Sequence, residues 1–151
     1  MRSRRRGGML VPLPPIAAGG ALGGLARYAV AAAWPVGPGA FPWSTLTVNI
    51  TGSFLLGMLM VLVLEVWRPT RYVRLVLGVG LLGAYTTFST LAVEADLLTG
   101  SGHVGTAAGY LLVSAAGGLA ALWAGRAAVR GLASAAVRRR PGEAHEKGSE
   151  E

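Results

Sequence analysis

The chain has 151 residues, of which 52% are hydrophobic and 14% charged, and its formal net charge is +7. This length suits one domain, and the lack of cysteine excludes disulfides and thiolate metal sites. The positive charge does not indicate nucleic-acid binding, because the basic residues flank long apolar segments, where they act in membrane topology.

Four stretches of the sequence contain no charged residue: 7–26, 43–64, 75–93 and 104–125. Each has roughly 19 to 22 residues, and at a rise of about 1.5 Å per residue each can span a hydrocarbon core of roughly 30 Å. The sequence therefore predicts an all-α membrane protein with four transmembrane helices.

In chain order, we expect helices over 15–34, 43–66, 73–98 and 104–129, joined by short loops. The basic start followed by an apolar stretch is similar to a signal peptide, but prolines at 12, 14 and 15 interrupt it, so we predict an uncleaved first helix. The expected organisation is a basic cytoplasmic segment (1–13), a four-helix transmembrane domain (14–132) and a polar, disordered tail (133–151).

The basic residues are distributed unevenly between the two sides of the membrane. Four precede the first helix, three lie between helices two and three, and six end or follow helix four, so thirteen of the fourteen lie on one side. The two opposite loops contain none. The positive-inside rule therefore predicts that both termini are cytoplasmic, in a multi-pass protein of the plasma membrane.

The fourteenth basic residue, Arg27, lies inside the first apolar segment, where a charge costs about 2.5 kcal/mol or more unless it reaches water or a partner. One interpretation is that it snorkels to the outer interface near Trp34. The other is that it faces an aqueous vestibule and attracts an anion. The residues alone leave both open.

Polar side chains form stripes on two of the expected helices. Thr45, Asn49 and Ser53 stand at i, i+4 and i+8 of the second helix, and so share one face. Such a stripe makes interhelical hydrogen bonds or lines a pore. Both interpretations also fit the stripe of the fourth helix: Thr106, Tyr110 and Ser114.

The third apolar segment contains "GVGLLGAYTTFSTLAVE" (78–94), in which Gly83, Thr86 and Thr87 weaken helix formation in consecutive turns. Backbone leaves helical geometry at membrane depth only where protein or a water-lined cavity satisfies it. Broken membrane helices use freed carbonyls to hold cations and half-helix N-termini to face anions. We therefore predict a break with an ion site, with the ring edge of Phe88 facing an anion.

No pair of buried carboxylates and no histidine cluster is evident in the sequence, so an enzyme is not expected. Glu94 and Asp96 fall where the third helix leaves the membrane, and we expect them to be a solvated helix end.

Three motifs closely resemble signature stretches of the Fluc/CrcB fluoride channels, in the same order: "GGALGGLARY" (19–28), "TLTVNITGSFLLG" (45–57) and "GLLGAYTTFST" (80–90). The resemblance covers all four helices. It implies an antiparallel dimer with two fluoride pores and a sodium ion on its two-fold axis, through which fluoride trapped in the cytoplasm flows out.

Carried over by motif position, the resemblance implies a role for nine residues. Backbone carbonyls of Gly83 and Thr86 from both subunits would hold the sodium ion. The remaining residues would line the fluoride path, with Arg27 near the vestibule and six others in the pore: Asn49, Phe88, Ser89, Thr90, Tyr110 and Ser114.

The chain departs from the family pattern in two respects. Leu91 stands where the family has a second phenylalanine, so one aromatic contact per pore is missing from this subunit. In addition, homodimers of this family insert in both orientations, whereas the uneven charge distribution fixes one orientation. Together they predict a heterodimer with a related subunit of opposite orientation.

Two other function classes fit part of the sequence. Small multidrug exporters are also four-helix antiparallel dimers, but they share a membrane-buried glutamate in the first helix. This chain has Arg27 and no carboxylate there. A non-conducting structural partner of a heterodimeric channel is the other alternative, and Leu91 and the fixed orientation favour it.

Overall fold

The computed structural model describes residues 13–66 and 71–138. Within these residues, four helical stretches are long and apolar enough to cross a membrane: Leu13–Ala33, Trp43–Glu65, Tyr72–Gly100 and Val104–Ala135. The prediction of a helical, multi-pass membrane protein with four spans is thereby confirmed. The basic start (1–12), residues 67–70 and the tail beyond 138 lie outside the described residues.

The spans are built from α-helices and two π-helical segments. The elements in order are α1 (Leu13–Ala33), α2 (Trp43–Val61), η1 (Leu62–Val66), α3 (Arg71–Arg74), η2 (Leu75–Leu82), α4 (Gly83–Tyr85), α5 (Phe88–Gly100) and α6 (Val104–Arg138). The third span is thus largely π-helical before residue 83, which the sequence analysis did not predict. Helix α6 is longer than expected and continues past residue 132, where we placed the end of the transmembrane domain.

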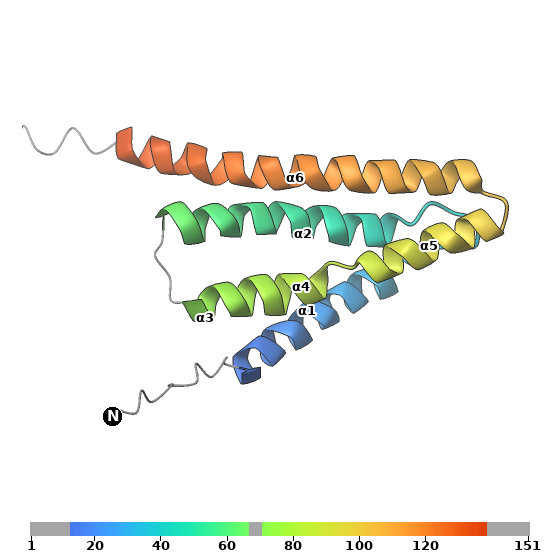
Figure 1. The fold of residues 1–151 in the computed structure, drawn as a ribbon, viewed down its shortest axis with the longest axis horizontal. Helices are drawn as coiled ribbons and strands as arrows, with labels where there is room; N and C mark the ends of the chain where they lie inside the picture. Colours follow the sequence, from blue (N-terminus) through green and yellow to red (C-terminus); the bar gives the residue numbers. More distant parts are fainter. Residues whose placement is uncertain (1–12, 67–70, 139–151) are drawn as a thin grey trace, which may run out of the picture.

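Helices α2 and α6 run side by side in the same direction, and the third span lies along the other side of α2 (Figure 1). Helix α1 crosses diagonally and packs on η2 and α4. Helix α3 and the C-terminal end of α6 lie at the same end of the bundle (Figure 1). Arg74 is the last residue of α3, Arg126 and Arg130 belong to the C-terminal third of α6, and Arg27 belongs to the C-terminal half of α1. Which end is cytoplasmic stays a prediction.

Glycines bring α2 and α6 into backbone contact. A Cβ atom at Gly57 would lie 2.2 Å from the Leu122 carbonyl oxygen, and one at Gly125 would lie 2.1 Å from the Phe54 carbonyl oxygen. Only glycine allows this approach, and close backbone packing of small residues drives helix association in lipid. Helix α1 contacts the third span similarly through Gly19 and Gly23, its two buried residues.

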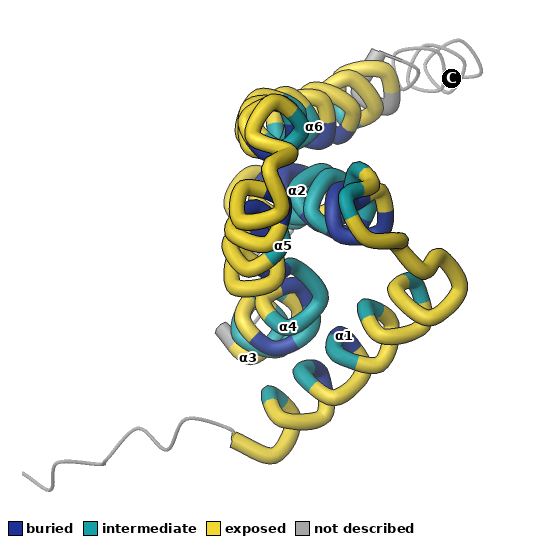
Figure 2. Tube along the Cα trace, turned by 90° about the vertical axis from the view of Figure 1, so that its right-hand side faces the viewer, coloured by how far each residue is buried: buried dark blue, intermediate teal, exposed yellow. Residues whose placement is uncertain are grey.

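The buried core is small and lies between α2, α5 and α6. Its cluster consists of Leu46, Leu91, Ala95, Leu98, Ala107 and Tyr110, with Phe41 and Ile50 packed against it. Most outward positions are exposed (Figure 2), and many carry large apolar side chains. An apolar exterior is what lipid requires, since lipid tails are as apolar as leucine.

Candidate functional site

The third span is interrupted at two threonines. Helix α4 ends at Tyr85 and α5 begins at Phe88, while Thr86 (φ −74°, ψ 155°) and Thr87 (φ −146°, ψ 122°) have extended backbone. The hydroxyl of Thr86 donates to the Leu82 carbonyl oxygen at 3.0 Å and so stays with the preceding turn. The interruption lies between two half-helices at membrane depth, where its polar backbone requires partners.

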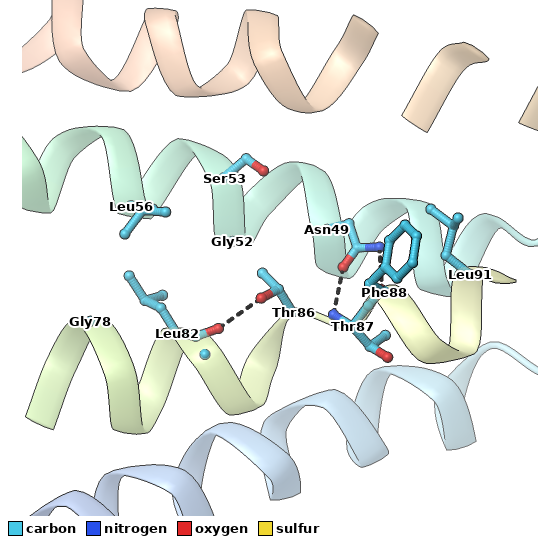
Figure 3. A pocket seen from close by; sticks show the side chains of 11 residues that line it. Asn49, Gly52, Ser53, Leu56, Gly78, Leu82, Thr86, Thr87, Phe88 and Leu91 are labelled. Atoms are coloured by element: carbon cyan, nitrogen blue, oxygen red, sulfur yellow. Dashed lines mark hydrogen bonds between the residues drawn. The ribbon is translucent and has the colours of Figure 1, made fainter. Parts of the chain in front are cut away.

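Asn49 of α2 holds the interruption from the side (Figure 3). Its amide nitrogen donates to the Thr87 carbonyl oxygen at 2.9 Å, and the Thr87 N–H donates to the Asn49 Oδ1 at 2.8 Å. The side-chain amide therefore replaces the hydrogen bond that the Thr87 N–H would donate inside a helix, and adds a donor to the Thr87 carbonyl oxygen. Asn49 was predicted as a pore residue, and its direct contacts in this structure are with backbone.

The hydroxyl of Thr87 caps helix α5. It accepts a hydrogen bond from the Thr90 N–H at 3.1 Å, donates to the Thr90 Oγ1 at 2.9 Å and lies 3.2 Å from the Ser89 Oγ. Thr87 is 7% exposed. The sequence analysis did not include it among the site residues, although a threonine three positions before another threonine or glutamate is the pattern of an N-cap.

The interruption leaves several backbone carbonyls without their α-helical donors, among them those of Gly83 and Thr86. In a continuous helix, the Gly83 carbonyl would accept from the Thr87 N–H, and the Thr86 carbonyl from the Thr90 N–H. Here the first N–H donates to Asn49 and the second to the Thr87 hydroxyl. Gly83 and Thr86 are the two residues that the resemblance assigned to the sodium ion.

Side-chain clusters offer no alternative metal site in the described parts of the chain. No three His, Asp or Glu side chains come together in residues 13–66 and 71–138. Freed carbonyl oxygens are ligands that suit a hard alkali cation. A cation at the interruption would therefore be held by backbone oxygens.

A cavity of about 310 Å³ opens beside the interruption (Figure 3). It is lined on the α2 side by Asn49, Gly52 and Ser53, and on the other side by Gly83, Thr86 and Phe88. The Phe88 side chain is 80% exposed, and Ser89 and Thr90 are exposed as well. Leu91 also lines the cavity but is only 9% exposed, because it belongs to the buried cluster with Leu46 and Tyr110.

Arg27 lines a second cavity, of about 250 Å³, on the other face of the interruption. Thr45, Thr87 and Thr90 line the same cavity, so the guanidinium and the hydroxyls share one space. Arg27 is partly buried rather than fully exposed. Of the two interpretations left open by the sequence, this location favours the one in which Arg27 faces a cavity.

The expectation for Glu94 is wrong. This residue is not a solvated helix end, because its Oε1 accepts from the Thr45 hydroxyl at 2.8 Å and its Oε2 accepts from the Tyr110 hydroxyl at 2.7 Å. Tyr110 is fully buried and stacks edge-on against Phe41, with ring centroids 5.4 Å apart. The carboxylate thus connects the polar stripes of α2 and α6 through α5. It also lines a third cavity, of about 510 Å³, next to His103.

Ser114, one turn after Tyr110, has a buried hydroxyl with no hydrogen-bond partner among the described residues. Neither Ser114 nor Tyr110 lines the three cavities. The structure therefore brings Asn49, Phe88 and the hydroxyls of α5 together around the interruption, and leaves Ser114 between α2 and α6.

The chain matches a known family. The sequence profile described as "CrcB-like protein, Camphor Resistance (CrcB)" matches residues 15–126, which include the interruption and the residues around it. The chain belongs to the CrcB family.

Relatives within the CrcB family carry an explicit functional name. The protein named fluoride-specific ion channel FluC 2 of Nocardia farcinica is 46% identical over 132 residues, which cover 84% of this chain and 94% of that protein. FluC 3 of Streptomyces avermitilis is 50% identical over 126 residues, covering 83% of this chain and 60% of that protein. FluC of Rhodospirillum centenum is 43% identical, covering 76% and 92%.

Proposed function

We propose that this chain is a subunit of a fluoride-selective ion channel that exports cytoplasmic fluoride. The observation that carries the proposal is the interruption at Thr86 and Thr87, which Asn49 stabilises inside a membrane span. It exposes hydroxyls and an aromatic ring beside a cavity in a CrcB-family chain. Relatives of this chain are named fluoride-specific ion channels. The names of these relatives are those of ion channels and not of enzymes.

Fluoride would follow the polar groups on both faces of the interruption. The Ser89 and Thr90 hydroxyls are exposed and can donate to an anion in place of its water. The edge of the Phe88 ring is electropositive and is accessible. Arg27 supplies a positive charge in the cavity that Thr45 and Thr90 share. Tyr110 and Ser114 would extend this polar track along α6.

The functional unit would be an antiparallel dimer with a sodium ion on its axis. The carbonyls of Gly83 and Thr86 lack their helical donors, and two subunits would offer four such oxygens to one ion. A bound sodium ion supplies a fixed positive charge at the centre of the dimer. The 80% exposure of Phe88 also fits a face that a second subunit covers.

The second subunit would be a related chain of opposite orientation. Thirteen of fourteen basic residues lie on one side of the expected topology, so this chain inserts in one direction. Because the chain has no cysteine, single cysteines can report its orientation directly. A cysteine at Gly37 should react with an impermeant thiol reagent only from outside, and one at Gly142 only from inside. Equal labelling of both from one side would contradict a fixed orientation.

The channel function is tested by efflux from liposomes that contain the purified chain, measured with a fluoride electrode and with chloride as the control. We expect fluoride-selective efflux once a reversed-orientation homologue is co-expressed, and none from this chain alone. Fluoride-selective efflux from this chain alone would overturn the heterodimer and retain the channel. No fluoride efflux with the partner present would contradict the proposed channel function.

A second candidate function rests on Leu91. It occupies the position of the family's second phenylalanine and is buried in the core, which favours a subunit that supports its partner's pore without conducting. Under that alternative, only the partner's pore conducts, and Leu91→Phe adds conduction through the pore of this subunit. Under the channel proposal, the pore of this subunit already conducts in the wild-type complex, and the substitution changes its rate without creating it.

A further inference from the structure

Two spans change from apolar to charged near the same end of the bundle. The uncharged runs 43–64 and 104–125 are followed by Glu65, in η1, and by Arg126, in α6. A run of this length extends about 33 Å, close to the thickness of the hydrocarbon core. Glu65 is therefore expected at the level of the lipid headgroups, on the side where the basic residues gather. Its partner Arg130 comes one turn after Arg126, so Arg126 lies about 6 Å farther into the membrane, where a long side chain can snorkel to the headgroups.

The Glu65 carboxylate already forms an ion pair with another arginine, Arg130. The Arg130 Nε donates to the Glu65 Oε2 at 3.0 Å, and the Nη2 of Arg130 donates to the Glu65 Oε1. This bidentate pair engages both carboxylate oxygens. Glu65 still attracts Arg126 through space, but it makes no hydrogen bond to Arg126 within the described residues. Within the described residues, Arg126 therefore has no counter-ion bonded directly to it.

Arg126 is held in place by its surroundings. Its Cζ lies 5.7 Å from the centre of the Trp123 ring, a cation–π distance. Its Nε is covered by protein and has no acceptor among residues 13–66 and 71–138. The preceding residue, Gly125, is locked against the Phe54 backbone. The arginine is thus held at its Nε end, while the residue as a whole is partly exposed.

We propose that Arg126 and Trp123 form a binding site for the phosphate of an anionic phospholipid in the leaflet on the basic side. The guanidinium matches phosphate oxygens in charge and in planar geometry. Trp123 is 62% exposed and precedes Arg126 by one helical turn, and indole rings favour the interfacial zone. Basic residues at the end of membrane helices are a recurrent means of binding anionic headgroups. The site lies on α6, away from the interruption in the third span.

The full chain is reconstituted in nanodiscs of phosphatidylcholine and phosphatidylglycerol, and native mass spectrometry counts the lipids that stay bound. We expect the wild type to enrich phosphatidylglycerol and Arg126→Gln to reduce that enrichment about fivefold. Arg74→Gln is the matched control, because Arg74 is an exposed arginine that makes no cation–π contact within the described residues. Its enrichment should equal that of the wild type.

Equal losses from Arg126→Gln and Arg74→Gln would overturn the site, since they would reflect general surface charge. No loss from Arg126→Gln would overturn it as well. If Arg126→Gln does not fold, Trp123→Leu decides, because it keeps the charge and removes the indole. A reduced enrichment supports the site, and an unchanged enrichment contradicts it. The lipid count requires no conduction, so it is independent of the proposed channel function.

Discussion

The α2–α6 pair and the interrupted third span use their backbones in opposite ways. In the pair, the backbone stays helical through the span, and glycines at 57 and 125 let the two backbones touch. In the third span, the backbone leaves helical geometry at Thr86 and Thr87, and a side chain from α2 takes over its hydrogen bonds. One region is a rigid support, and the other has the freed polar groups that an ion needs.

The comparison also explains why the two regions are adjacent. Asn49 can hold Thr87 only if α2 is fixed, and α2 is fixed by its contact with α6. A loosely placed amide would not replace two backbone hydrogen bonds at once, since hydrogen bonds weaken steeply with misalignment. A well-ordered α2–α6 pair is therefore required for a well-ordered interruption. Substitutions in the chain can separate the two regions.

The largest effect is expected at Gly125. In Gly125→Ala the added Cβ would meet the Phe54 carbonyl oxygen at 2.1 Å, so α2 and α6 must separate. We expect the free energy of unfolding to fall by about 1–3 kcal/mol or more. Thermal unfolding in detergent measures the loss. Gly109→Ala on the same helix is the control, because nothing lies within 4 Å of its added Cβ. Equal stability of the two variants would contradict the backbone contact.

Asn49→Ala should disable the interruption while sparing the support. It leaves the Thr87 N–H without its partner and removes a donor from the Thr87 carbonyl oxygen, at a cost of about 1–3 kcal/mol for the unsatisfied N–H. We expect fluoride efflux from the conducting complex to fall at least about tenfold. Leu55→Ala, at an exposed position of the same helix, should keep most of the efflux. The contact of Asn49 with Thr87 has no functional role if Asn49→Ala conducts as well as Leu55→Ala.

A smaller effect is expected at Thr87, where shape and hydroxyl can be separated. Thr87→Val keeps the branched shape and loses the cap of α5, worth about 1 kcal/mol, so efflux should fall about fivefold. Thr87→Ser keeps the hydroxyl and should restore efflux to near the wild-type rate. If valine and serine behave alike, the hydroxyl does not order Ser89 and Thr90.

The smallest effect is expected at Glu94, where support and site meet. Glu94→Gln removes the charge from the hydrogen bonds of Thr45 and Tyr110, and should lower the free energy of unfolding by about 1 kcal/mol. Asp96→Asn, on the exposed face of the same helix, should stay within about 0.5 kcal/mol of the wild type. A matching loss in both variants would mean that Glu94 is a solvated end after all.

Much of the fold could be predicted from the sequence, because membrane spans leave a local signal. Uncharged runs of fixed length predict four helices whatever their partners are. The same runs do not predict the π-helical segment η2, since hydropathy does not distinguish α-helical from π-helical hydrogen bonding. They also hide the length of α6, whose alanine-rich end continues the helix beyond the apolar run.

The candidate site was predictable only in part. The weakened helix around Gly83 and Thr86 is a local feature, and it drew attention to the right segment. The partners were not predictable, because the contact of Asn49 with Thr87 and that of Glu94 with Tyr110 depend on how whole helices are rotated against one another. A helical period identifies a face, and packing decides what that face meets.

We infer that the interrupted third span, rather than the α2–α6 pair, builds the ion site. The most direct measurement is fluoride efflux from the conducting complex, purified and reconstituted without sodium, before and after sodium is added. The account predicts efflux that is several-fold slower in a large organic cation and recovers with sodium, because only a small cation can bind the carbonyls of Gly83 and Thr86. Efflux that is equally fast in both conditions would contradict it.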